Sequence, residues 1–273
     1  MKKLFLIFVI LLHVILGYSQ IISPDKDYRN VGSAKVLNGK TYVLVLFVAS
    51  KYSTEWTQAE MDDVYRKIYQ SFSWLKESAL QYNSDVDFSL FVLGNNEKII
   101  MDYIPKGPFE GKYSTDLLKK AMNAAGYDDV FDFEAYAHEK INSDNCVVYV
   151  CCNNYGRSYA LPKNLSLSNY YKTYGINRDY LEGCVLYKNY TDGTPLNSAS
   201  IAHETLHLFG AADLYDVYGG SNSQKDKYMQ SYFPKSIMRK VPNNIYEAEI
   251  DNLTAFLVGI SSSYESWYDY FLQ

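Results

Sequence analysis

The segment 197–213 constrains this chain more than any other, because it carries two histidines four residues apart. Its core pattern is His-Glu-x-x-His-x-x-Gly-x-x-Asp, which begins at His203. Residues four apart lie on one face of an α-helix, so the imidazoles of His203 and His207 can share one metal ion. Gly210 stands where a helix needs a left-handed residue to turn the chain back. We expect that turn to bring Asp213 towards both histidines as a third ligand.

The residues around the histidines support a hydrolytic metal site. Asn197 or Ser198 can cap the helix, which we expect to end at Phe209. Glu204 follows the first histidine and can reach a water on the metal rather than the metal itself. Three protein ligands leave zinc one open position for that water. The spacing therefore predicts one zinc ion held by His203, His207 and Asp213, with Glu204 as the general base.

Composition limits the alternatives. A chain of 273 residues with 48% hydrophobic and 21% charged residues can bury a sizeable core and has ordinary globular composition. The formal net charge is -5 and no lysine or arginine run makes a basic stripe, so nucleic-acid binding is disfavoured. The acidic residues are spread along the chain and mark no calcium loop. The sequence does not set the oligomeric state, and a monomer is assumed.

The N-terminus predicts export. Residues 1–19 combine Lys2 and Lys3, an apolar stretch and the small residues that a signal peptidase reads. The apolar stretch is shorter than the roughly 20 residues needed to cross a bilayer. We therefore expect a cleavable signal peptide, no membrane insertion after cleavage, and a secreted, periplasmic or cell-surface protein. Residues 20–38 are expected to form an N-terminal arm.

Hydrophobic periodicity from residue 39 onward predicts one α/β domain over residues 39–273, with no linker that divides it. A capping box, Thr57-Gln-Ala-Glu60, opens the longest helix. The expected strands are 41–48, 86–93, 146–152 and 184–187, with 156–160 at an edge; the expected helices are 57–82, 114–125 and 131–141. Strand, helix and strand over residues 41–93 form a parallel βαβ unit by default.

The four cysteines fit an oxidising compartment but are poorly spaced for disulfides. Cys146 lies too far along one strand from Cys151 and Cys152 to pair with either. Cys184 is then the natural partner for one of the three, and at most one bridge is expected.

The metal pattern resembles the extended zinc motif of the metzincin metallopeptidases, in the subset with aspartate as third ligand that includes snapalysin and immune inhibitor A peptidases. Ser236-Ile237-Met238 matches the methionine turn that this family places beneath its metal, and residues 250–259 match its C-terminal helix. The resemblance covers roughly residues 39–262. It implies a zinc-dependent endopeptidase acting on peptides or proteins. It also implies a twisted mixed sheet with an antiparallel edge strand, and a small lower subdomain over about 214–273.

The resemblance also implies where a peptide would bind. The edge segment Gly156, Arg157, Ser158, Tyr159 and Ala160 would take an extended peptide by strand addition. Tyr232 and Phe233, just before the methionine turn, would shape the pocket on the leaving-group side. Some metzincins carry a tyrosine two residues after the turn methionine; Lys240 stands there instead.

Three alternatives remain open. Glu247-Ala-Glu-Ile-Asp251 has the spacing of the helix that supplies a glutamate ligand in thermolysin-like peptidases. Asp216 could replace Asp213 as the third ligand, although a position in contact with a ligand residue, and not with the metal, suits it better. A non-catalytic exported binding or adhesion module on a peptidase scaffold is the third, and the retained Glu204 argues against it.

Overall fold

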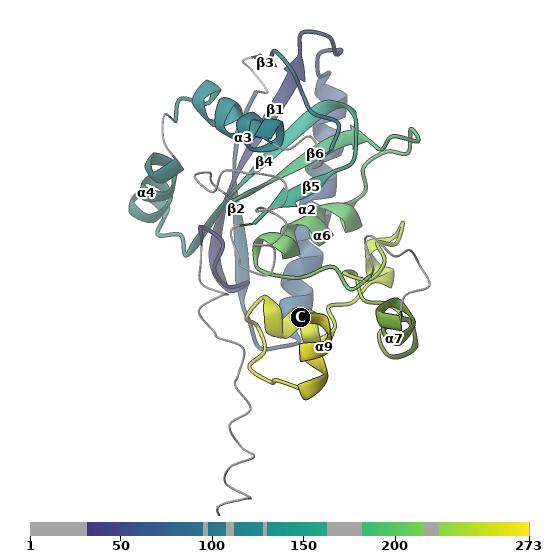
Figure 1. Cartoon of the computed structure of the whole chain (residues 1–273). Helices are drawn as coiled ribbons and strands as arrows, with labels where there is room; N and C mark the ends of the chain where they lie inside the picture. The colour runs from purple at the N-terminus through teal and green to yellow at the C-terminus, as the bar shows by residue number, and fades with distance from the viewer. Residues whose placement is uncertain are drawn as a thin grey trace, which may run out of the picture.

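The computed structural model describes residues 32–94, 98–107, 112–127, 130–162, 182–215 and 224–272. The expected signal peptide and most of the expected arm lie outside these ranges. The chain is mixed α/β, with seven α-helices and a mostly parallel sheet within them (Figure 1). The strands are β1 (Gly39–Ser50), β2 (Val86–Leu93), β3 (Ile99–Met101), β4 (Asn145–Tyr155), β5 (Tyr159–Leu161) and β6 (Gly183–Asn189).

The sheet is ordered β2-β1-β4-β6-β5, and β3 pairs with the end of β1. All pairings are parallel except that of β5, which runs antiparallel to β6 at the edge. The central strands β1 and β4 are buried along almost their whole length because helices cover both faces of the sheet. The predicted parallel unit over residues 41–93 is confirmed. An antiparallel edge strand also precedes the metal helix, with β6 between them in the chain, but it covers only part of the predicted segment 156–160.

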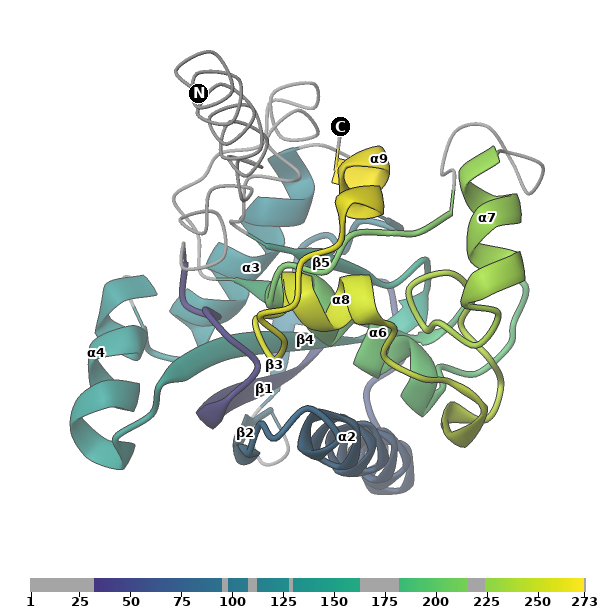
Figure 2. The same ribbon diagram turned by 90° about the horizontal axis from the view of Figure 1, so that it is seen from below.

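Two hydrophobic cores lie on opposite faces of the sheet. On one face, alternate β1 residues such as Val45 and Phe47 pack with α2 (Gln58–Leu80) and α6 (Ser198–Leu208). On the other, the intervening residues such as Leu46 pack with α3 (Lys112–Ala124) and α4 (Val130–Ile141). Figure 2 shows α2 and α3 on opposite sides of the strands. The metal motif therefore belongs to the face that α2 covers.

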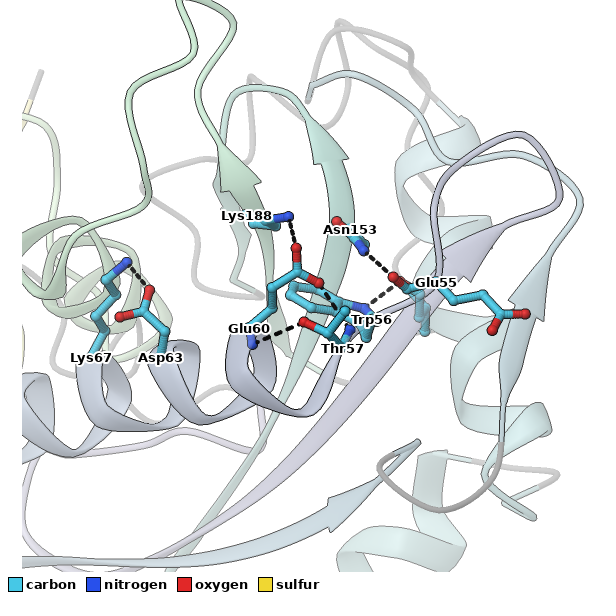
Figure 3. Close-up of polar contacts among 9 residues, drawn as sticks. Glu55, Trp56, Thr57, Glu60, Asp63, Lys67, Asn153 and Lys188 are labelled. Carbon is cyan, nitrogen blue, oxygen red and sulfur yellow. Dashed lines mark hydrogen bonds and ion pairs between the residues drawn. The ribbon is translucent and has the colours of Figure 1, made fainter.

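The N-terminus of α2 is anchored to three strands. Thr57 and Glu60 form the predicted capping box. The Trp56 indole donates to the Val48 carbonyl of β1 (2.9 Å), and the Glu60 carboxylate accepts from Lys188 of β6. Asn153 of β4 donates to the backbone carbonyl just before Trp56 (2.9 Å; Figure 3). Because these contacts reach β1, β4 and β6, they fix the long helix against the sheet face that also holds α6.

The C-terminal part forms a separate group of short elements below α6 in Figure 1. They are α7 (Gln224–Tyr232), the 3-10 turn η4 (Ile245–Glu247), α8 (Asn252–Leu257), the 3-10 turn η5 (Ser266–Tyr268) and α9 (Asp269–Leu272). The helix expected over 250–259 is shorter than predicted, because Asp251 caps it from outside by accepting from the Thr254 N–H (3.0 Å). Within the described ranges, no helix is long and apolar enough to cross a membrane.

All four cysteines are buried free thiols, so the expected bridge from Cys184 is not formed. Cys146 and Cys152 face the core beneath α3 and α4, whereas Cys184 faces the opposite core. Cys151 shares the face of Cys184, but the register places Tyr149 opposite Cys184. Cys151 is therefore a diagonal neighbour, about 7 to 8 Å away by strand geometry, which exceeds the reach of a disulfide.

Candidate metal centre

The helix α6 begins and ends as its sequence predicts. The Asn197 side chain caps it by accepting from the Ser200 N–H (2.8 Å). At the other end the Gly210 N–H donates to the His207 carbonyl and the Ala211 N–H to the Leu206 carbonyl, both at 3.0 Å. This pair of bonds is the Schellman ending, and Gly210 has the positive φ (107°) that it requires. The turn sends the chain back towards the face of α6 that carries the histidines.

The turn brings three ligand atoms together. Nε2 of His203 lies 3.1 Å from Nε2 of His207, and Oδ1 of Asp213 lies 3.3 Å and 3.2 Å from these two atoms. Both histidines are buried. Oδ1 of Asp213 is also buried and has no hydrogen-bond donor in the described part of the chain. These three residues, the ligands predicted from the sequence, form a cluster that could hold a metal ion.

Backbone carbonyls orient both imidazoles. Nδ1 of His203 lies 3.0 Å from the Ile237 carbonyl, and Nδ1 of His207 lies 2.8 Å from the Ala211 carbonyl. A carbonyl accepts only, so Nδ1 carries the proton in each ring and Nε2 keeps its lone pair. Both lone pairs then belong to the atoms that converge at the cluster, which is the arrangement found behind metal-bound histidines.

Met238 belongs to a segment that backbone bonds connect to the cluster. Its side chain is fully buried, and its carbonyl accepts from the Leu214 N–H (3.0 Å). The residue before it supplies the carbonyl that orients His203. The segment around Met238 is thereby tied both to a histidine of the cluster and to the residue that follows Asp213.

Electrostatics within the cluster are strong. Burial lowers the pKa of His207, but the Asp213 carboxylate outweighs it and raises that pKa to about 9. Burial favours the neutral form of Asp213, and the two histidines more than offset it, so its pKa falls well below the usual range. Opposite charges this close stabilise each other. The Asp213 carboxylate therefore favours positive charge at the cluster.

Glu204 and Tyr215 complete the surroundings of the cluster. Burial raises the pKa of Glu204, although the neighbouring histidines and Arg157 act in the opposite direction. Burial also raises the pKa of the Tyr215 phenol, with Asp213 contributing both charge and a hydrogen bond. The sequence pattern ends at Asp213 and assigns no role to Tyr215, because the position of Tyr215 relative to Asp213 depends on the turn at Gly210.

The expected peptide-binding segment is only partly a strand. β5 covers Tyr159–Leu161, so Gly156, Arg157 and Ser158 lie outside it. The Ser158 hydroxyl accepts from the Tyr187 N–H (3.1 Å), which replaces a ladder bond with a side-chain bond. Gly156 packs against the Tyr187 ring so closely that a Cβ would lie 2.4 Å from it. Ala160 lies in β5 and pairs with Cys184 of β6.

The remaining candidates lie elsewhere. Phe233 stacks on Trp267 and Tyr232 contacts Tyr228, so both join an aromatic group formed with η5 and α9. Glu247 is exposed at the end of η4 and is not in the cluster. Asp216 lies outside the described residues. Among the described carboxylates, Asp213 is the one that joins the two histidines.

Sequence reasoning missed the groups that hold the cluster from behind. The carbonyls of Ile237 and Ala211 are backbone atoms, which leave no signature in residue type. The sequence suggests Asp251 only as the end of the Glu247–Asp251 spacing of thermolysin-like peptidases, whereas its carboxylate accepts from Ser236 and Thr254. A hydroxyl residue within the expected methionine turn is the one sequence signal that could have drawn attention to Ser236.

No family model matches the chain, and no curated protein shows significant sequence similarity to it. The function is therefore argued from the cluster itself.

Proposed function

We propose that this chain is an exported zinc-dependent endopeptidase of metzincin type. The observation that carries the proposal is the triangle formed by Nε2 of His203, Nε2 of His207 and Oδ1 of Asp213. The sides of that triangle are 3.1, 3.2 and 3.3 Å. Zinc bonds of about 2.0 to 2.1 Å in a tetrahedron place neighbouring ligand atoms about 3.3 Å apart.

The donor set also suits zinc. Two neutral imidazole nitrogens and one carboxylate oxygen are common zinc ligands, and three of them leave the fourth vertex of the tetrahedron open. The buried Oδ1 of Asp213 without a donor gains a partner when a cation is bound. Calcium and magnesium prefer more oxygen ligands than this cluster supplies.

Zinc bound here supplies a Lewis acid that lowers the pKa of water towards neutrality and polarises a carbonyl group. Glu204 follows His203 on α6 and interacts electrostatically with both histidines. Its carboxylate takes the proton from the attacking water and delivers it to the leaving amine. Burial raises the pKa of Glu204, which makes it a stronger base than an exposed glutamate.

A peptide substrate is supported by the edge of the sheet. β5 is the antiparallel last strand in the order of the described sheet, and it contacts α6. An extended peptide can pair with such an edge and so lie across the cluster. A mostly parallel sheet, an antiparallel edge strand and a metal helix that follows it are the order expected of a metzincin. Residues 1–19 support export.

The test measures metal and turnover together. We expect the purified protein to bind one zinc ion, located by anomalous scattering between His203, His207 and Asp213, and to cleave a quenched-fluorescence peptide library. His207→Ala should lose the metal, because it removes one of three ligands. Glu204→Gln should keep the metal and lose turnover.

Each other outcome contradicts a defined part of the proposal. No bound zinc would refute the metal centre, and a zinc ion on Glu247 would favour a thermolysin-like site. Bound zinc with no cleavage of any library member would favour a non-catalytic binding module. Substantial turnover in Glu204→Gln would refute the general base.

A further inference from the structure

The backbone carbonyls that orient the two histidines come from different parts of the chain. The carbonyl that orients His207 belongs to Ala211, in the turn that ends the same helix. The carbonyl that orients His203 belongs to Ile237, which reaches it from a separate segment. The position of Nε2 in His203 therefore depends on how firmly residues 235–239, here called the methionine loop, are held.

Backbone bonds hold the methionine loop against the segment that precedes α8. The Ile237 N–H donates to the Glu249 carbonyl (3.1 Å), and the Glu249 N–H donates to the Lys235 carbonyl (2.9 Å). Both Ile237 and Ser236 are fully buried. Two side chains of the loop also make polar contacts: Arg239, whose Nε lies 3.3 Å from Oδ1 of Asp226, and Ser236, which contacts the residue that caps α8.

The Ser236 hydroxyl donates to Oδ2 of Asp251 at 2.6 Å. Asp251 is itself immobilised, because its Oδ1 accepts from the Thr254 N–H (3.0 Å) and its Oδ2 also accepts from the Thr254 hydroxyl (2.6 Å). All three side chains are buried. A buried carboxylate with three donors is a rigid anchor, since moving any donor leaves a polar group unsatisfied.

We propose that Ser236 and Asp251 are positioning residues of the metal centre. They hold the Ile237 carbonyl in place, and that carbonyl fixes the tautomer and orientation of His203. The inference rests on the metal centre of the proposed function but not on peptide hydrolysis. It assigns a role to an aspartate that contacts no ligand in the cluster.

The chain offers a matched pair of variants. Ser236→Ala and Thr254→Val each remove one hydroxyl that donates to the same oxygen of Asp251, but only Ser236 lies in the methionine loop. Loss of a residue that hydrogen-bonds a metal ligand typically reduces metal affinity by roughly 10- to 100-fold. Ser236 acts on His203 through one further contact, so we expect Ser236→Ala to weaken zinc affinity by about the lower limit, tenfold. Thr254→Val should destabilise the fold and leave zinc affinity unchanged.

The measurements are zinc competition against a chelator and solvent exchange of the His203 Nδ1 proton by NMR in the zinc-loaded protein. Ser236→Ala should weaken zinc binding and speed that exchange. Asp251→Asn is the second variant: its carbonyl keeps the cap on Thr254, and its amide can contact the Ser236 hydroxyl only as a donor, which replaces a charge-assisted bond with a weaker one. It should change zinc affinity and exchange in the same direction as Ser236→Ala, by a smaller amount.

Wild-type zinc affinity and unchanged exchange in Ser236→Ala and Asp251→Asn would overturn the inference while leaving the proposed function intact. Equal losses of affinity in Ser236→Ala and Thr254→Val would also overturn it, because they would indicate a purely structural role. A wild-type protein that binds no zinc would overturn both proposals.

Discussion

Gly210 allows the turn at the end of α6 to be tested separately from the ligands. Its φ of 107° is one that residues with a side chain rarely adopt. Forcing alanine into left-handed backbone costs about 1 to 2 kcal/mol. We expect Gly210→Ala to lower the free energy of unfolding of the metal-free protein by that amount, and the melting temperature by roughly 2 to 8 °C for a chain of this size.

The same change should weaken zinc binding. Ala211, whose carbonyl orients His207, directly follows the glycine, and Asp213 lies two residues further on. If the backbone relaxes to relieve alanine, both groups move. Displacing an outer partner of a metal ligand reduces affinity by roughly 10- to 100-fold, which corresponds to about 1.4 to 2.8 kcal/mol. The zinc-loaded protein should therefore lose more stability than the metal-free protein.

Gly126 provides a close control. It ends α3 with the same pair of backbone bonds, from Gly126 to Asn123 and from Tyr127 to Met122. Its φ is 88°, and an added Cβ would meet no atom within 4 Å. Gly126→Ala should thus carry a similar backbone penalty and leave zinc affinity unchanged.

The assays are urea unfolding of the metal-free proteins and zinc competition against a chelator. We expect Gly210→Ala and Gly126→Ala to destabilise the metal-free protein equally, and only Gly210→Ala to lose zinc affinity. Wild-type zinc affinity in Gly210→Ala would refute the argument that this turn sets the third ligand.

Three further predictions concern stability. Burial raises the pKa of Glu60, but the bonds from Lys188 and Thr57 together outweigh it and lower the folded pKa below 4.5. The stabilisation from the Glu60 carboxylate is therefore present above pH 4.5 and lost as the pH falls through the folded value. Glu60→Gln should lower stability in urea at pH 7, and its difference from the wild type should close on acidification. Leu206→Ala, at a fully buried position of α6, should cost about 2 to 5 kcal/mol, and a loss under 1 kcal/mol would contradict the packing of α6. Adding a chelator should lower the melting temperature of the wild type because zinc binds the folded state, whereas Asp213→Ala should show a much smaller shift in differential scanning calorimetry.

Local sequence patterns predicted the bounds of elements that bury one face and that begin or end at a capping or turn residue. The strand predicted over Val86–Leu93 has those bounds, because its residues alternate between core and solvent. The helix that opens at Thr57 was located by its capping box. Gly126 ends α3 as expected, one residue earlier than the predicted boundary.

Elements that depend on distant contacts were predicted less well. The residues of 156–158 alternate as a strand should, yet the chain pairs with β6 only from Tyr159, because a hydroxyl and a close glycine replace the ladder beside Tyr187. The expected bridge from Cys184 failed for a similar reason. Spacing along one strand excludes some pairs, but the register between β4 and β6 decides which thiols face each other.

Within the metal site, one histidine is oriented by a local contact and the other by a distant one. The orientation of His207 follows from the sequence, since the glycine that ends the helix also places the Ala211 carbonyl four residues away. The orientation of His203 does not, because its partner comes from a loop that only the packed C-terminal part brings near. A histidine held by local backbone keeps its geometry whenever α6 forms, whereas one held from a distance requires the C-terminal elements as well. Changes in the methionine loop should therefore leave α6 folded while they disturb the metal centre. Changes in the Gly210 turn should affect the end of α6 and the metal centre together.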